Sequence, residues 1–259
     1  TEYGGEPSSG GTHLALLGFD VGSYIELIAA HVLGVFGGMW ATQVAGDAGP
    51  CAWAARSSGI AAEAARLAAL GIPVRGPLAM HRRRPDGTRV EWELAFPGDG
   101  TPGNTLPFLI EDTTPRALRV LPSPAVAGSE LRGVGQVVLG VERLAPAAEL
   151  FCRAYGWPAP DLHDDASFGA RLARFSGTPV TLAEPLPGAE GAWLAARLAR
   201  FGPAPCAFLL ASADLAASTQ RMGLGLPADW CGRPAAWVPE GQRGAAHVGA
   251  VTSDGRSVG

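Results

Sequence analysis

The sequence predicts an α+β protein built from two related halves, and three observations carry this prediction. Segments with strand-like alternation and segments with helical spacing follow one another along the chain, separated by Gly- and Pro-containing turns. Hydrophobic residues make up 47% of the 259 residues and charged residues 17%, which is ample for a packed core and excludes a disordered chain. The third observation is an internal repeat.

The repeat consists of two separate stretches that recur at nearly the same spacing. Segment 51–73, CAWAARSSGIAAEAARLAALGIP, returns as segment 206–227, CAFLLASADLAASTQRMGLGLP. Segment 16–29, LLGFDVGSYIELIA, returns as segment 172–184, LARFSGTPVTLAE. Ala-rich amphipathic helices resemble one another in any case, but that explanation does not cover the second match. The sequence therefore indicates an internal duplication.

The first half predicts hairpins, strands and one helix. Residues 12–29 form a hairpin by their turn chemistry, because Asp20-Val21-Gly22 separates two apolar runs. A helix begins at Ser58, since apolar residues then recur at helical spacing until 71–73 end it. The other expected elements are a strand over 51–56, a hairpin over 82–96 that turns at 85–87, and a strand over 105–111.

The second half repeats this order after a Pro- and Ser-rich boundary at 121–130. We expect a first half over 1–122, a second half over 131–251 and a flexible tail over 252–259. The elements expected in the second half are strands over 134–141, 205–212, 235–238 and 245–251, helices over 146–155 and 215–222, and a hairpin over 169–184.

Four segments together resemble a known family. They are GTHLALLGFDVGSYIELIA at 11–29, RRRPDGTRVEWEL at 82–94, LPFLIED at 106–112 and, more weakly, GQVVLGVERLAPAAELF at 135–151. They resemble the glyoxalase-like domains of the vicinal-oxygen-chelate superfamily, which includes glyoxalase I, extradiol dioxygenases and bleomycin-resistance proteins. The resemblance implies tandem βαβββ modules whose curved mixed sheets form clefts.

The first module lacks its opening strand and helix. Gln136, on the opening strand of the second half, precedes the hairpin residue Phe175 by 39 residues, whereas the matching Phe19 has 18 residues before it. The cause is either truncation or trimming at the N-terminus or a real degeneration of this module, and of these we expect truncation. Residue 1 is Thr, so a removed signal peptide can be neither seen nor excluded.

The resemblance also implies candidate metal ligands. Members of the superfamily hold a divalent metal with His, Gln or Glu on strands of paired modules, and the matching residues are Glu26, Gln136 and His247. Neither half has a complete set, so one divalent ion (Fe, Mn, Ni or Zn) stays an open prediction. Glu26 is also the candidate catalytic residue, as metal ligand or general base. The alternative is an ion pair between Glu26 and Arg56 on the neighbouring strand, because a buried carboxylate needs a partner.

We expect the cleft of the first half to be the working one. The candidate substrate-binding residues are His13, Tyr24, Arg56 and Trp92. The Arg82-Arg83-Arg84 run is either a solvated hairpin arm or a clamp for an anionic substrate, which arginine suits through bidentate hydrogen bonding.

Two functions remain open, and the sequence does not decide whether the protein is an enzyme. One is a glyoxalase-like protein that binds a small organic molecule, with metal-dependent lyase- or dioxygenase-type chemistry. The other is a metal-free protein that binds or sequesters a small molecule, as bleomycin-resistance proteins do. The net charge of −4 argues against nucleic acid as a partner, and no apolar run reaches the roughly 18–20 residues of a membrane span. We expect a cytoplasmic homodimer, and light scattering that finds only monomer would refute the dimer.

Overall fold

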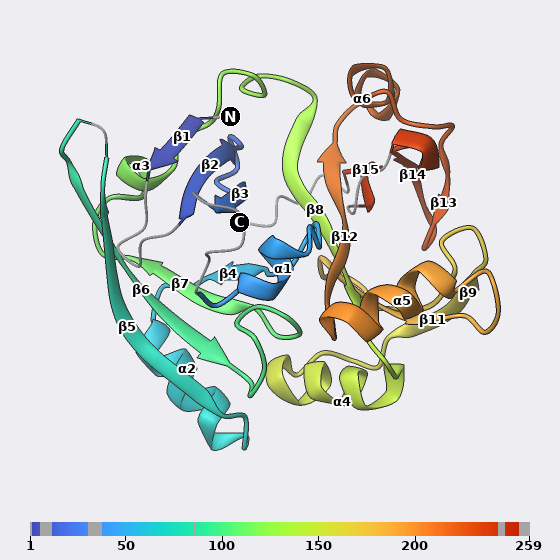
Figure 1. The fold of residues 1–259 in the computed structure, drawn as a ribbon, viewed down its shortest axis with the longest axis horizontal. Coiled ribbons are helices and arrows are strands. Elements are labelled where there is room, and N and C mark those ends of the chain that lie inside the picture. The colour runs from blue at the N-terminus through green and yellow to red at the C-terminus, as the bar shows by residue number, and fades with distance from the viewer. Residues whose placement is uncertain (1, 6–11, 31–37, 85, 243–246, 254–259) are drawn as a thin grey trace.

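The chain folds into three β-sheets with helices packed against them, which confirms the α+β prediction (Figure 1). A computed structural model describes residues 2–5, 12–30, 38–84, 86–242 and 247–253. The first sheet has the strand order β1-β2-β3 and is antiparallel throughout. Its strands are β1 (Glu2–Gly5), β2 (Thr12–Gly18) and β3 (Tyr24–Ala30).

The predicted turn joins β2 and β3. The Phe19 amide donates to the Ser23 carbonyl at 3.0 Å and closes the hairpin. Gly22 has a φ of 86°, a backbone conformation that residues other than glycine rarely adopt. The hairpin predicted over 12–29 is therefore confirmed.

The second sheet completes the first half and has the order β4-β7-β6-β5. Strands β4 and β7 pair in parallel, and the other two pairs are antiparallel. The elements of this part are α1 (Ala41–Ala45), β4 (Ala54–Arg56), α2 (Ile60–Ala69), β5 (Val74–Arg83), β6 (Arg89–Pro97), β7 (Phe108–Asp112) and α3 (Arg116–Arg119).

The second half forms one mixed sheet of eight strands, in the order β13-β14-β15-β12-β8-β11-β10-β9. Its elements are β8 (Leu131–Gly140), α4 (Leu144–Tyr155), β9 (Asp161–Asp165), β10 (Ala170–Arg174), β11 (Val180–Pro185), α5 (Ala192–Phe201), β12 (Ala204–Ser212), α6 (Leu215–Met222), β13 (Ala228–Trp230), β14 (Arg233–Trp237), the 3₁₀ helix Glu240–Gln242 and β15 (His247–Thr252).

The two halves share strand order and pairing, as the internal repeat predicts. The β1-β2-β3 order matches β9-β10-β11, and β4-β7-β6-β5 matches β12-β15-β14-β13. In the second half β8 joins the two groups, because it pairs in parallel with β11 and antiparallel with β12. Among the described residues of the first half no strand takes the place of β8, so its two sheets stay separate.

One core connects the halves. Ile60, Ala64 and Leu67 of α2 belong to the same buried cluster as Leu144 and Phe151 of α4. Helix α2 packs on the four-stranded sheet and α4 on the eight-stranded sheet, and the two helices contact each other, since Arg66 of α2 donates to the Ala154 carbonyl of α4 at 2.8 Å.

The opposite face of the eight-stranded sheet is filled by α5. This inner face, defined by Val138, Leu172, Ala183, Leu209, Trp230 and Val251, packs against Leu194 and Leu198 of α5. Aromatic rings complete the filling: Trp193 of α5 stacks on His247 with ring centroids 4.0 Å apart, and Phe168 contacts both rings. The inner face of the second half is thus occupied by the protein's own side chains.

Several elements differ from the sequence predictions. Strand β5 begins at Val74 instead of 82, and β15 runs to Thr252, into the tail expected over 252–259. His163 lies on strand β9 and not in a loop; the DLHDD sequence has no apolar alternation because β9 is the sheet edge. Elements that were not predicted are β1, α1, α3, α5, β9 and β13.

Within the described residues, no helix is both long enough and apolar enough to cross a bilayer.

Candidate functional site

Strand β3 presents Tyr24 and Glu26 on one face, because side chains alternate along a strand. The register of the hairpin places Leu16 opposite Glu26 and Leu14 opposite Ile28, so this face also carries the buried residues of β2. The predicted substrate-binding residue His13 lies at the alternate position of β2 and faces the other side. His13 is therefore not brought together with Tyr24 and Glu26.

Glu26 is exposed, yet protein groups surround it. Its carboxylate makes no hydrogen bond or ion pair with any residue that the structure describes. The surrounding protein groups partly desolvate the carboxyl and raise the pKa of Glu26, and the guanidinium groups of Arg119 and Arg82 oppose that rise. An accessible carboxyl group with a raised pKa and no partner is able to accept or donate a proton to a bound molecule.

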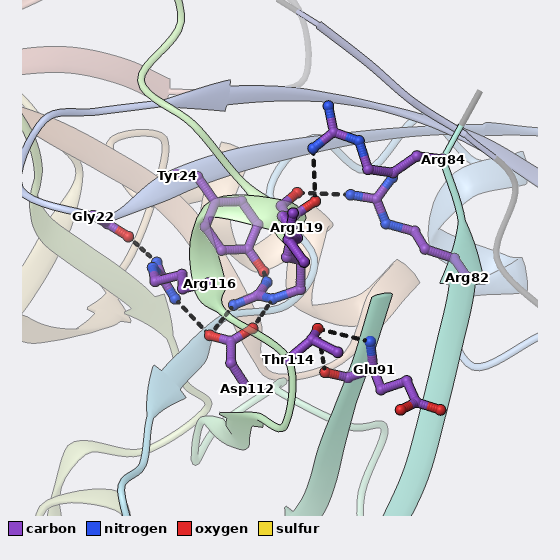
Figure 2. Close-up of polar contacts among 10 residues, drawn as sticks. Gly22, Tyr24, Arg82, Arg84, Glu91, Asp112, Thr114, Arg116 and Arg119 are labelled. Atoms are coloured by element: carbon purple, nitrogen blue, oxygen red, sulfur yellow. Dashed lines mark hydrogen bonds and ion pairs between the residues drawn. The ribbon is translucent and has the colours of Figure 1, made fainter. Parts of the chain in front are cut away.

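Arg119 on α3 connects Tyr24 to Asp112 (Figure 2). Its Nη1 donates to the Tyr24 hydroxyl at 2.7 Å, its Nη2 donates to Asp112 Oδ2 at 3.1 Å, and its Nε donates to Asp112 Oδ1. The side chains of Arg119 and Asp112 are 5% and 11% exposed, so this pair is buried. Burial would raise the pKa of Asp112, but the hydrogen bonds and charges of Arg119 and Arg116 outweigh it and hold the pKa below its ordinary value.

Arg116 ties the same carboxylate to the β2–β3 turn. Its Nη1 lies 3.3 Å from Asp112 Oδ2, and its Nη2 donates to the Gly22 carbonyl. The guanidinium carbons of Arg116 and Arg119 lie 5.8 and 5.2 Å from the centre of the Tyr24 ring, within the range of a cation–π contact. Because α3, β7 and the hairpin share these contacts, the position of Tyr24 and Glu26 relative to the four-stranded sheet is fixed.

Arg82 and Arg84 satisfy backbone carbonyls at the C-terminal end of α3. Arg82 Nη2 donates to the Arg119 carbonyl at 2.7 Å, and Arg84 Nη1 donates to the Leu118 carbonyl at 2.9 Å (Figure 2). Arg82 is 6% exposed. For Arg82, the solvated-arm alternative is therefore wrong.

Trp92 lies on the same face of the four-stranded sheet as Arg82 and Asp112. In the strand register Val90 lies opposite Arg82, and Asp112 lies opposite Trp92. Val90 and Trp92 are alternate residues of β6, so all four side chains point to the same face. Trp92 is half-buried and packs with Met80 and Phe108 against the cluster of Leu94, Phe96 and Ile110. The face thus combines half-exposed apolar side chains with two charged groups. Arg56 does not pair with Glu26; the cations that face Glu26 are Arg119 and Arg82.

Gln136 is a core residue of the second half. Its Nε2 donates to the Thr181 hydroxyl at 2.7 Å, and its Oε1 accepts from the Trp230 indole at 2.6 Å. All three residues are buried on the inner face. The expectation that Gln136 ligates a metal conflicts with these contacts, because its amide is already satisfied.

The three candidate metal ligands do not converge. Glu26 lies on β3 of the first half, whereas Gln136 and His247 lie on the eight-stranded sheet, where His247 stacks on Trp193. Among the described residues there is no group of three or more His, Cys, Asp or Glu side chains that suits a metal ion. The donor set of the described residues therefore does not fit the divalent metal that the family resemblance implies.

Sequence reasoning missed three residues of the site: Asp112, Arg116 and Arg119. Helix α3 has a single turn, so no hydrophobic period marks it. Two local signals were present. Asp112 closes a strand with buried neighbours, and two arginines follow Pro115, a residue that often precedes a helix.

Comparison with known proteins agrees with this fold. A hypothetical protein from Staphylococcus aureus has a similar structure, with a TM-score of 0.59 and 12% identity over 97% of this chain and 89% of that one. A methylmalonyl-CoA epimerase from Mycobacterium tuberculosis aligns with a TM-score of 0.40 and 19% identity over 49% of this chain and 92% of that one. A Streptomyces coelicolor methylmalonyl-CoA epimerase variant in complex with 2-nitronate-propionyl-CoA gives a TM-score of 0.38 and 18% identity over 48% and 99%.

No curated protein matches the sequence significantly. The model of the family described as "Glyoxalase-like domain" matches residues 1–150, which is more than half of the 259 residues. The chain therefore belongs to the glyoxalase-like domain family.

Proposed function

We propose that this protein binds a small organic molecule between β3 and the four-stranded sheet, with the Glu26 carboxyl as its principal polar contact and without a metal ion. The single observation that carries the proposal is the state of Glu26. It is exposed, its pKa is raised, and it makes no hydrogen bond or ion pair with a described residue. A protein gains no stability from such a group, and strained or unsatisfied groups cluster at binding sites.

The surroundings suit a ligand of mixed character. Tyr24 accepts a hydrogen bond from Arg119 and keeps its own hydroxyl hydrogen as a donor. Trp92, Met80 and Phe108 offer half-exposed apolar surface on the facing sheet. Small-molecule sites combine apolar walls with a few placed polar groups in this way.

The contrast between the halves supports the same location. The position that matches Glu26 in the second half is Thr181, which is buried and hydrogen-bonded to Gln136. Helix α5 and the aromatic cluster occupy the inner face there. The first half is therefore the better candidate for binding.

A screen of fluorinated fragments tests the proposal. The fragments are aryl ketones, phenols and hydroxy acids, and binding is detected by ¹⁹F NMR line broadening. We expect hits that Glu26→Gln weakens and that Glu93→Gln leaves unchanged, because Glu93 lies on the other face of β6 from Trp92. Hits that are equally strong in wild type and Glu26→Gln would refute the location.

A second candidate function follows from the raised pKa of Glu26. A carboxyl group whose pKa is moved toward neutrality serves well as a general base, so Glu26 would take a proton from carbon next to a ligand carbonyl and return it. Exchange of that hydrogen for deuterium in D₂O, followed by ¹H NMR, is the measurement. Exchange that is equal with wild type and Glu26→Gln would exclude this role.

A further inference from the structure

The inference concerns Arg82, a buried guanidinium group without a carboxylate partner. Arg82 is 6% exposed, and its hydrogen bond to the Arg119 carbonyl uses one of five N–H groups. Among the described residues, no Asp or Glu oxygen lies within 4.0 Å of it. Buried charges are ordinarily paired, so this cation lacks the partner that its burial calls for.

The groups that face Arg82 do not supply that partner. They are Glu26, Arg119, Arg84 and Tyr24, and Glu26, the acidic group among them, forms no ion pair with Arg82 within 4.0 Å. Asp112 is occupied by Arg119 and Arg116. Arg84 is paired with Asp86 at 3.5 Å. Among the described residues, the other three guanidinium groups (Arg82, Arg116 and Arg119) thus share the site with two carboxyl groups (Glu26 and Asp112), which leaves an excess of positive charge.

The position of Arg82 places the excess charge on the proposed binding surface. Arg82 shares the face of the four-stranded sheet with Met80 and Trp92, and it interacts electrostatically with Glu26 of β3. An arginine fork binds a carboxylate through two parallel hydrogen bonds. We infer that the ligand is a small organic acid, whose carboxylate binds Arg82 while its apolar part contacts Trp92 and Met80; this inference rests on the proposed function.

Protonation of Glu26 accompanies this binding. The charged or titratable groups around Glu26 are Tyr24 on the same strand, Arg82 on β5, Arg119 on α3 and Cys51 before β4. A second negative charge at Arg82 raises the pKa of Glu26 further, because like charges disfavour ionisation. Binding of an acid therefore takes up a proton, and its affinity rises as the pH falls through the raised pKa of Glu26.

Benzoate and benzamide are the probes, since they share size and shape and differ in charge. We expect isothermal titration calorimetry to give at least tenfold tighter binding of benzoate to wild type. Arg82→Met should remove this preference and Arg82→Lys should reduce it, because lysine keeps the charge and loses the fork. Arg89→Met is the matched control: Arg89 is an exposed arginine of the adjacent strand, paired with Glu91 at 2.7 Å, and its loss should change nothing. Circular dichroism verifies that each variant is folded.

The outcomes separate this inference from the proposed function. Equal affinity for both probes in wild type, or a preference that survives in Arg82→Met, overturns the role of Arg82. If Glu26→Gln still weakens both probes in that case, the proposed function stands and the acid specificity fails. No binding of either probe to wild type also overturns the inference, and the fragment screen then decides the proposed function independently. Titration in two buffers of different ionisation enthalpy should show proton uptake that Glu26→Gln abolishes.

Discussion

The Arg119–Asp112 pair allows a quantitative test of how the first half is held together. Replacing Asp112 by Asn keeps the shape of the side chain and removes its charge. One carboxylate oxygen then becomes an NH₂ group that faces the N–H groups of Arg119 and Arg116. The Arg119 side chain is 5% exposed, so solvent cannot replace the lost partner and little screening applies. Breaking a buried pair in this way costs about 3–5 kcal/mol.

Thermal unfolding followed by circular dichroism measures this cost. For a chain of this size, about 1 kcal/mol corresponds to about 2–4 °C, so we expect the midpoint to fall by about 6 °C or more. Asp164→Asn is the control, because the Asp164–Arg171 pair is 51% and 55% exposed and should contribute nothing measurable. Equal midpoints for the two variants would refute the reasoning that burial makes the Asp112 pair important.

The pH dependence provides a second check on the same pair. The folded-state pKa of Asp112 is lowered, so its contribution is complete above the ordinary value for an unfolded Asp, about 3.9. The contribution is lost as the pH falls through the lower pKa of the folded state. The difference between wild type and Asp112→Asn should therefore persist at neutral pH and disappear in strong acid.

Three further substitutions have directions that the structure fixes. Glu26→Gln should raise the midpoint of thermal unfolding at pH near 7 and leave it unchanged below about pH 4.3. The reason is that the raised pKa of Glu26 means that its ionisation destabilises the folded state. A lower midpoint at pH 7 would contradict this. Arg197→Met should speed hydrogen exchange over 46–56, because buried Arg197 of α5 donates to the carbonyls of Ala48, Pro50 and Pro205; unchanged exchange there would count against the tie. Gly18→Ala should cost about 1–3 kcal/mol in chemical denaturation, since a Cβ would meet the Leu121 carbonyl oxygen at 2.1 Å; wild-type stability would disprove the close approach.

The fold was predictable from the sequence where local chemistry determines it. The turn at Asp20-Val21-Gly22 and the apolar period of α2 specify their elements without help from the rest of the chain. Strand β9 and helix α3 were missed because their place depends on neighbours: β9 is a polar sheet edge, and α3 is one turn held by side chains of β5 and β7.

The site was less predictable because its contacts join distant segments. The family resemblance pointed to Glu26, and Tyr24 was expected in the same cleft, but Arg119 lies 95 residues from Tyr24 in the sequence. Strand alternation suggested Arg56 as the partner of Glu26, whereas the fold brings Arg82 and Arg119 to it. The contacts of Gln136 were unpredictable for a related reason, because the sequence does not reveal that Trp230 reaches its amide.

The filling of the second half by α5 has a consequence for how the two halves tolerate change. Substitutions of the apolar residues on the inner face, such as Leu194, Leu198 and Leu209, alter packing alone, so their effects should follow volume and cavity size. In the first half, by contrast, the fold keeps the Glu26 carboxyl, whose ionisation weakens it. The packing of the second half then offsets the free-energy cost of an unfavourable charge in the first half.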